Sequence, residues 1–588
     1  MAAAPCNPAS TQTCALPFPS DYWSAPSAQS PTGRVLNITD NVLPAAVLDQ
    51  LTARDVRPSA ILNGDSGFSP ASPVLFEFGT LPASASMPND GGDAVKVFNL
   101  RTGEVLEIRA ELRQVNQPWT LEKSGLIEVF PRTRWPYGDQ LLAVVTGSLD
   151  VLGESSNLQT TLARSADQTG YAAELARAVA ATGLNPSTLR SATLFTVRDR
   201  NEVIGPMINA VADTYRRDHP VRDIQVSFKP LDEGKLAVVT GDLRLDIYRE
   251  DDGRGNVNFS AKPTHAWVPF RLTLPPAAEQ GMVPVALYGH GLTASRNLDA
   301  GVEPTNSRLG IATFGIDYPN LGARATMDGG FLLTSQSPRK LPLLFGMLNQ
   351  SIIDMASAQK ALQSALSELD VVGARGGWLE GYRPKGDGVP DLDTRRLMLQ
   401  GTSLGGVLGA TYAPIGPGIE AALLPGTGSG MMNAFYESVV WNMLMQFLVP
   451  SRATAAETLF YRNLMQQAVD HADSLNYVDL MRNRPDGSPD RPLLVLSGLG
   501  DSIISNNSTI ATARLAQLPV VGEVLYPVTG VEQREDYDEG FGLRQYLPIL
   551  DDRWYGDNAA DFSTHFTFLR AEALEHQEQW LKRYFLKQ

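Results

Sequence analysis

Hydrophobic and polar positions follow two different patterns along this chain. Between residues 36 and 275, short apolar runs are separated by turn signals rich in glycine and aspartate. Short strands with this punctuation are typical of a β-rich, sandwich-like domain. The strands expected there are Val74–Phe78, Lys96–Asn99, Leu141–Thr146, Lys235–Thr240 and Trp267–Leu274, and the expected helices are Tyr171–Thr182 and Val203–Arg217.

From about residue 276, fully apolar short runs alternate with longer stretches of helical periodicity. In Ser351–Leu369, for example, apolar residues recur at the spacing that places them on one face of a helix. Apolar strands that alternate with helices predict an α/β fold, with a mostly parallel sheet and helices on both faces. The expected strands are Val283–Tyr288, Ile311–Ile316, Arg396–Gln400, Ala421–Leu424, Leu493–Ser497 and Glu523–Val528, and a helix over Phe566–Phe585 is expected to close the chain.

The two patterns suggest a domain organisation. With 588 residues the chain is too long for one ordinary hydrophobic core, so two or more domains are expected. We divide it into an extended N-terminal arm at 1–35, a β-rich domain at 36–275 and an α/β domain at 276–588. Within the last of these, residues 430–490 form a long insertion between two predicted strands, which we expect to be a helical cap or lid.

The composition limits the partners. Apolar residues make up 43% of the chain and charged residues 19%, which is typical of a globular protein. The formal net charge of −15 repels phosphate backbones, so no nucleic acid is expected as a partner, and a neutral or apolar substrate suits the charge better. The longest strongly apolar stretch, Val439–Val449, is far shorter than the roughly 20 residues that span a bilayer, so no transmembrane segment is expected. The oligomeric state is left open.

Both cysteines lie near the N-terminus. Cys6 and Cys14 would close a short loop if oxidised, which favours a disulfide in an oxidising compartment over two free thiols in a flexible tail. Residues 1–20 show no basic start followed by an apolar run, so no signal peptide is visible. We therefore expect a secreted, periplasmic or cell-surface protein whose leader is absent from this chain.

One serine stands where a catalytic nucleophile would. The predicted strand Arg396–Gln400 runs into Gly-Thr-Ser-Leu-Gly at Gly401–Gly405, and a helix rich in small residues follows. This strand–turn–helix context is the condition for a nucleophile elbow, in which a tight, strained turn projects the Ser403 hydroxyl above the sheet. The alternative is a glycine-rich helix start that is merely packed against a sheet.

A second motif carries a family resemblance. About 110 residues upstream, Tyr-Gly-His-Gly-Leu at Tyr288–Leu292 directly follows a predicted strand. Here the chain resembles the α/β-hydrolase superfamily of serine esterases and lipases, in particular bacterial extracellular lipases that carry a β-rich domain ahead of the hydrolase domain. The resemblance implies that the backbone N–H groups of Leu292 and Leu404 form an oxyanion hole, and that His290 borders the substrate.

The same resemblance implies a histidine and an acid after the nucleophile. Of the six histidines, only His471, His565 and His576 follow Ser403. His565 lies in a loop just before the last predicted helix, where the family places its catalytic histidine. Asp501 directly follows a predicted apolar strand, as the family's acid does. The rivals for the acid are Asp536, Asp538, Asp551 and Asp552, which lie in an acidic stretch without a preceding strand.

The predicted insertion contains candidate substrate contacts. Its first part holds apolar residues that suit an acyl chain or an aromatic ring, although such residues also pack a cap against its core. They are Met431, Met432, Phe435, Tyr436 and Trp441.

Metal ligation has one weak candidate. Asp387, Asp391 and Asp393 are carboxylates at close spacing, as in calcium loops, but they lack the twelve-residue EF-hand pattern. A solvated turn is the alternative. We therefore expect no cofactor and no metal, with calcium at this loop kept as the exception.

Together these motifs predict a serine hydrolase that cleaves carboxylic esters of the esterase or lipase type through an acyl-enzyme on Ser403. Two alternatives stay open. One is a serine peptidase or amidase of the same fold, since prolyl-peptidase-like enzymes also place a β domain first. The other is a non-catalytic surface binding protein. The sequence leaves open the acyl length and the choice between a small ester, a lipid and a polyester.

Overall fold

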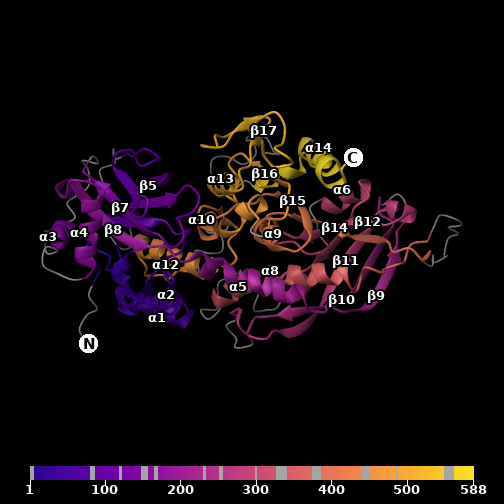
Figure 1. Ribbon diagram of the computed structural model, residues 1–588, viewed down its shortest axis with the longest axis horizontal. Coiled ribbons are helices and arrows are strands. Elements are labelled where there is room, and N and C mark those ends of the chain that lie inside the picture. The colour runs from indigo at the N-terminus through magenta and orange to yellow at the C-terminus, as the bar shows by residue number, and fades with distance from the viewer. Residues whose placement is uncertain are drawn as a thin grey trace. The chain divides into compact units, whose positions relative to one another are not determined.

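The computed structural model describes residues 6–79, 86–117, 122–147, 156–163, 170–229, 234–250, 256–297, 301–325, 341–373, 386–439, 449–484, 487–548 and 562–588. The chain folds into two compact units (Figure 1). Unit 1 comprises Met1–Gly205, Ser337–Pro342 and Met445–Asp470. Unit 2 comprises Pro206–Gln336, Leu343–Leu444 and His471–Gln588.

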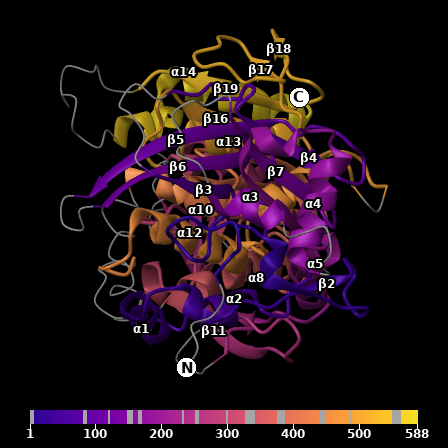
Figure 2. The same cartoon turned by 90° about the vertical axis from the view of Figure 1, so that its left-hand side faces the viewer.

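Two three-stranded antiparallel sheets, ordered β3-β6-β5 and β4-β7-β8, form the framework of unit 1. Figure 2 shows β5 and β6 running side by side as a long hairpin. The strands of unit 1 are β1 (Ser24–Pro26), β2 (Arg34–Leu36), β3 (Val74–Phe78), β4 (Val95–Asn99), β5 (Ile108–Gln117), β6 (Glu122–Pro131), β7 (Gln140–Thr146) and β8 (Leu189–Thr196). Its helices are α1 (Ala45–Ala53), α2 (Pro58–Leu62), α3 (Ser156–Ala163), α4 (Tyr171–Ala181) and α12 (Ala455–Val469), and α5 (Arg200–Tyr215) is divided between the two units.

The helix α12 reaches unit 1 from far along the chain. Its Arg462 forms an ion pair of 2.6 Å with Glu128 on β6, and both side chains are buried. The side-chain amide of Asn463 donates to the carbonyl of Pro73 at 2.8 Å. Because these contacts are with the N-terminal strands, residues 455–469 belong to unit 1 and not to an insertion of the α/β unit.

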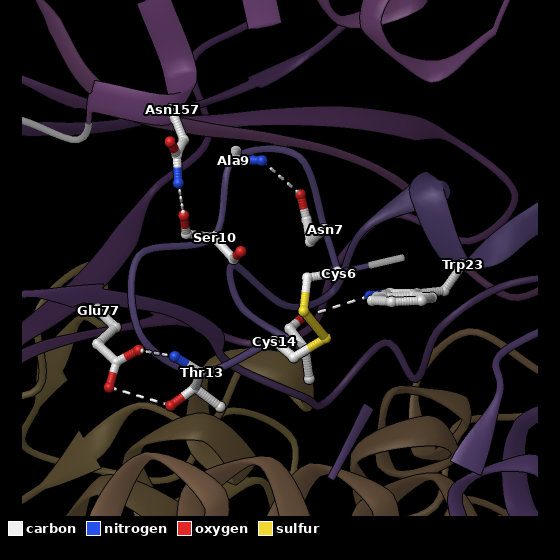
Figure 3. The surroundings of a disulfide bond; sticks show 10 residues. Cys6, Asn7, Ala9, Ser10, Thr13, Cys14, Trp23, Glu77 and Asn157 are labelled. Atoms are coloured by element: carbon white, nitrogen blue, oxygen red, sulfur yellow. Dashed lines mark hydrogen bonds between the residues drawn. A yellow bond between two sulfur atoms is a disulfide. The ribbon is translucent and has the colours of Figure 1, made fainter. Parts of the chain in front are cut away.

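A disulfide closes a loop within the N-terminal arm, and side-chain hydrogen bonds hold this loop to the rest of unit 1 (Figure 3). Cys6 and Cys14 are bonded to each other. Between them, Thr13 donates its N–H to the Glu77 carboxylate at 2.6 Å and its hydroxyl at 3.1 Å. Trp23, just beyond the loop, is buried and donates its indole N–H to the carbonyl of Ala15 at 3.3 Å. The arm is thus part of the packed unit.

Replacing both cysteines by serine should lower the free energy of unfolding of unit 1 by about 2 kcal/mol, because the unfolded chain regains the freedom that the closed loop removes. Thermal unfolding of the oxidised protein and of the C6S/C14S variant measures this. A reductant should shift the midpoint of the native protein and leave that of the variant unchanged. An equal response of both proteins would contradict the prediction.

Unit 2 is built on one eleven-stranded sheet with the order β18-β17-β19-β16-β15-β14-β12-β13-β11-β10-β9. The strands from β18 to β13 pair in parallel, whereas β11, β10 and β9 pair antiparallel at one end. The strands are β9 (Val221–Phe228), β10 (Ala237–Ile247), β11 (Thr264–Leu274), β12 (Val283–Gly289), β13 (Ala312–Ile316), β14 (Leu392–Gly401), β15 (Ile419–Pro425), β16 (Leu493–Gly498), β17 (Val520–Val521), β18 (Gln533–Arg534) and β19 (Gly542–Tyr546). The expected large sheet of the α/β region is therefore present, with an antiparallel extension.

Helices pack on both faces of this sheet. Met398 on β14 lies in a core cluster with Trp580 and Phe585 of the C-terminal helical segment. The next residue, Leu399, points to the other face, where it meets Gly409 of α9. The helices of unit 2 are α6 (Val302–Arg308), α8 (Leu341–Gln363), α9 (Leu404–Ile415), α10 (Met431–Tyr436), α13 (Asn506–Leu515) and α14 (Ala571–Trp580), which continues as a π-helical segment, Leu581–Leu586.

Three expectations about this architecture need correction. The division between the units does not fall at 275–276, because β9, β10 and β11 pair into the sheet of unit 2. Glu523–Val528 is not a strand, since the backbone N–H groups of Leu525 and Tyr526 bond to the side chain of Gln545. The expected helix over Phe566–Phe585 is interrupted at Arg570, whose backbone is extended.

The predicted sandwich in the N-terminal region stays a prediction. Across the described parts of the chain, every helix is too short or too polar to cross a lipid bilayer.

Candidate active site

Ser403 occupies a strained turn between β14 and α9. Its φ of 57° and ψ of −119° are unfavourable for a residue with a Cβ. The turn is possible because its neighbours have no side chain. A Cβ on Gly401 would lie 2.2 Å from the Gly405 carbonyl oxygen, and one on Gly405 would lie 2.0 Å from the Gly289 carbonyl oxygen. The Gly-Thr-Ser-Leu-Gly motif therefore has the strained strand–turn–helix geometry that the sequence analysis expected there.

Asp501 and His565 form a buried pair. Asp501 follows the end of β16, and both of its carboxylate oxygens lie close to His565 Nδ1, at 3.0 and 2.9 Å. The side chains are each 1% exposed. The backbone N–H groups of Ile503 and Ile504 donate to Asp501 Oδ1 at 2.9 and 3.0 Å, which fixes the carboxylate. A carboxylate at Nδ1 makes this nitrogen the proton-bearing one and leaves Nε2 as the acceptor.

The second imidazole nitrogen of His565 is buried and has no hydrogen-bond partner among the described residues. A buried polar atom without a partner is costly in a folded protein, and such atoms are found at sites that complete their bonding with a reactant. His565 Nε2 is thus placed to receive a proton.

The backbone brings the His565 ring to the elbow. The Ser403 N–H donates to the carbonyl of Pro425 at 3.1 Å. At the next residue, a Cβ on Gly426 would lie 2.9 Å from His565 Cε1, so the ring stands directly against this glycine. The structure therefore brings together the three residues that the sequence analysis selected as nucleophile, acid and base. Asp536 and Asp538 instead pair with arginines, Asp536 with Arg583 and Asp538 with Arg482, and Asp551 and Asp552 lie outside the described residues.

Two contacts between residues that the sequence analysis did not select hold the His565 loop to the Asp501 turn. The Ser502 N–H donates to Thr564 Oγ1 at 3.0 Å. A Cβ on Gly498 would lie 1.8 Å from the Thr564 carbonyl oxygen, so only glycine permits this approach. A glycine at the end of an apolar strand just before an acid was the only signal for the second contact.

The predicted oxyanion donors lie beside the nucleophile. A Cβ on Gly291 would lie 3.6 Å from Ser403 Cβ and 4.0 Å from its Oγ, so the residue before Leu292 borders the hydroxyl. Leu404 is the first residue of α9, and the first N–H groups of a helix have no partner within it. Neither the Leu292 nor the Leu404 amide donates to another of the described residues.

His290 holds the loop that carries Leu292, and it does not face a substrate. Its side chain is fully buried. The Tyr318 N–H donates to Nε2 at 3.1 Å, so Nδ1 bears the proton and donates to the Gly291 carbonyl at 2.8 Å. Burial lowers the pKa of His290, in keeping with a neutral ring that accepts one bond and donates another. The expected substrate contact is therefore corrected to a support for the loop.

The candidate substrate residues divide into three groups. Met431 and Met432 at the start of α10 are buried in the protein interior. Phe435 and Tyr436 on the same helix are half-buried and remain accessible in part. Trp441 lies outside the described residues.

An aromatic residue beside the base was missed by the sequence analysis. Phe566 is 37% exposed, and its ring lies edge-on to His565 with 5.3 Å between the ring centroids. A single phenylalanine next to a histidine carries no sequence signal of this arrangement. The Phe566 ring places an apolar surface next to the His565 imidazole.

The calcium candidates do not converge. Asp391 is buried and accepts from the Val371 N–H at 2.8 Å. Asp393 pairs with Arg395 at 2.9 Å, and Asp387 is exposed. Among the described residues, no three His, Cys, Asp or Glu side chains form a group that could hold a metal ion.

The pKa of Asp391 offers a test of the calcium hypothesis. Burial raises it from 3.8 to about 6, so the folded state holds the proton more tightly than the unfolded chain and loses stability as the pH rises from about 4 to 6. The D391N variant should therefore be more stable than the native protein at pH 8, by about 1–2 kcal/mol, and closely similar at pH 4. Denaturant titrations at both pH values measure this. Destabilisation by D391N together with a calcium-dependent rise in the native melting temperature would support a calcium site instead.

Comparisons with known proteins give only distant structural similarity. No family model matches the chain, and no curated protein matches it. Acetyl xylan esterase 1 from Thermoanaerobacterium is 13% identical, over 62% of this chain and 92% of that one, with a TM-score of 0.33. S-formylglutathione hydrolase from Agrobacterium tumefaciens is 15% identical, over 62% and 99%, with a TM-score of 0.29. An acylaminoacyl peptidase is 10% identical, over 63% and 49%, with a TM-score of 0.32.

Unit 2 has the mixed α/β architecture that the sequence analysis expected. A large mixed sheet carries helices on both faces, and the strand–Ser403–helix turn lies at the end of its β14 strand.

Proposed function

We propose that this protein is a serine hydrolase that cleaves carboxylic esters, with Ser403 as nucleophile, His565 as base and Asp501 as the acid that orients it. The observation that carries the proposal is the buried His565 ring, whose Nδ1 is held by Asp501 and whose Nε2 has no partner among the described residues. This ring stands against Gly426, next to the residue that binds the Ser403 backbone.

The mechanism follows from this geometry. His565 Nε2 takes the Ser403 hydroxyl proton while Oγ attacks the ester carbonyl. The negative charge that develops on the carbonyl oxygen is stabilised by the Leu292 and Leu404 N–H groups and by the N-terminus of α9. His565 then protonates the leaving alcohol, and a water molecule activated by the same ring hydrolyses the acyl-enzyme. Asp501 keeps the proton on Nδ1 and stabilises the charged imidazole.

Apolar surroundings favour an uncharged substrate. Phe566 is exposed next to the base, and Phe435 and Tyr436 are half-buried on α10. The formal net charge of −15 also disfavours anionic substrates. We therefore propose a neutral ester with an apolar alcohol or acyl part. The Cys6–Cys14 bond supports a secreted, periplasmic or cell-surface location.

Hydrolysis of p-nitrophenyl esters with acyl chains of two to sixteen carbons tests the proposal. The native protein should turn over at least one of them, and S403A should lose at least about a thousandfold in kcat. D501N should lose about a thousandfold or more, because the amide favours the wrong imidazole tautomer. The control is S364A, since Ser364 is an exposed serine of unit 2 whose hydroxyl bonds to the carbonyl of Lys360.

The alternatives predict different results. A peptidase or amidase would cleave the p-nitroanilide of the same acyl group in a Ser403-dependent reaction, whereas the proposed esterase would cleave the p-nitrophenyl ester and leave the anilide intact. A non-catalytic binding protein would leave Ser403 unmodified by a fluorophosphonate, whereas the proposed enzyme should be labelled at Ser403 and not in S403A. Undiminished ester turnover by S403A would refute the assignment of the nucleophile.

A further inference from the structure

Two consecutive residues after β13 contact both ends of the loop that carries the Leu292 amide. The loop runs from His290 to Arg296, between the end of β12 and the segment that leads to α6. At its start, the Tyr318 N–H donates to His290 Nε2 at 3.1 Å, and the Tyr318 ring packs on the imidazole with 4.6 Å between the centroids. The Tyr318 hydroxyl lies under Gly289, where a Cβ would come within 2.3 Å of it.

Asp317 binds the other end of the same loop. The Arg296 N–H donates to Asp317 Oδ1 at 2.7 Å, and the Arg296 guanidinium forms an ion pair with Oδ2. The Asp317 side chain has no exposed surface, and that of Arg296 is 15% exposed. A charge-assisted contact of this kind, away from water, holds its partners in one geometry more strongly than an exposed ion pair does.

Asp317 is itself held in place on its other side. The Ala323 N–H donates to Oδ2 at 2.8 Å, and Arg324 bridges the Asp317 carbonyl, at 2.9 Å, to the buried carboxylate of Asp354, at 2.6 Å. Gly322 has a φ of +53°, and a Cβ there would lie 2.4 Å from the Asp317 carboxyl carbon. The carboxylate therefore cannot shift without moving the chain around it.

We infer that Asp317 is a positioning residue for the reaction proposed above, which fixes the loop His290–Arg296 so that the Leu292 N–H faces the oxyanion. The inference rests on the proposed function. Asp317 does not touch the substrate or the reacting atoms. It acts through Arg296, four residues beyond Leu292, while its neighbour Tyr318 acts through His290, two residues before it.

Loosening this loop should affect the transition state more than the bound substrate. An oxyanion donor contributes most when it lies within hydrogen-bond distance of the charged oxygen that forms during the reaction, and a misplacement of about 1 Å is costly. Substrate binding depends on the rest of the pocket. The signature of a lost positioning residue is therefore a lower kcat at nearly constant KM.

The test compares D317N with the native protein on the best p-nitrophenyl ester. In D317N, the side-chain amide keeps one acceptor oxygen but has no negative charge to face Arg296. Its NH2 group replaces the other oxygen and so faces a donor that bonds to this oxygen in the native protein. We expect kcat to fall by roughly 10- to 100-fold and KM to stay within about threefold. The inhibition constant of a phenylboronic acid, which binds Ser403 as a tetrahedral adduct, should rise in parallel with the fall in kcat/KM.

A matched control separates positioning from general destabilisation. Asp246 is a buried carboxylate on β10 of unit 2, and its side chain pairs with Arg217 at 2.9 Å and with His265 at 3.1 Å, not with the loop His290–Arg296. D246N should lower the melting temperature and leave kcat within about twofold of native. If D317N does not fold, R296M provides the second variant, because it removes the guanidinium and keeps the Arg296 N–H bond to Asp317. We expect R296M to show the same kcat loss at constant KM.

The outcomes distinguish the two proposals. Ser403-dependent turnover in the native protein with an unchanged kcat in D317N, or a change in KM alone, would overturn the role of Asp317 and leave the proposed function intact. A kcat loss of equal size in D246N would also overturn it, and so would failure of both D317N and R296M to fold, which would make the contact purely structural. Absence of Ser403-dependent turnover in the native protein would overturn both proposals.

Discussion

The site depends on a close approach of three glycines that belong to different backbone segments. The end of β12 at Gly289, the end of β14 at Gly401 and the first turn of α9 at Gly405 come together at distances that no Cβ permits. Ser403 lies between Gly401 and Gly405, so this contact and the strained backbone of Ser403 occur together. The contact also sets the start of the oxyanion loop, because His290 follows Gly289 directly. A larger residue at any of the three positions would displace Ser403 and the proposed oxyanion donors together.

The acid and the base depend on a second contact of the same kind. Asp501 and His565 are 64 residues apart, yet Gly498 lets the Thr564 carbonyl pack against the end of β16, and the Thr564 hydroxyl accepts from Ser502. The contacts of Thr564 with Gly498 and Ser502 thus fix the Asp501–His565 pair independently of Ser403. Phe566 and Phe568 lie edge-on to the His565 ring, at centroid distances of 5.3 and 6.2 Å, and restrict its rotation.

The sequence predicted those parts of the molecule that leave a local signal. Strands such as β3 and β16 consist mostly of apolar residues, and the Gly-Thr-Ser-Leu-Gly motif stands out because a strand precedes it and a helix follows. Ser403, Asp501 and His565 could be selected because each of the first two follows an apolar strand and few histidines are available. The strand β19, Gly542–Tyr546, has no such signal, since polar residues interrupt it and its pairing with β16 makes it a strand. Long-range partners, such as Asp317 for Arg296 or Glu128 for Arg462, leave no trace in local composition.

The assignment of α12 to unit 1 has a consequence for how the protein is made. Unit 1 uses residues up to Gly205 and then a helix that begins at Ala455, and the buried Arg462 of that helix neutralises the buried Glu128. During translation, the N-terminal strands emerge from the ribosome long before this helix does. Until Arg462 is synthesised, Glu128 has Arg113 on the neighbouring strand β5 as its ion-pair partner. Unit 1 is therefore completed only after much of unit 2 has emerged, and no single cleavage point separates the two units into self-sufficient fragments.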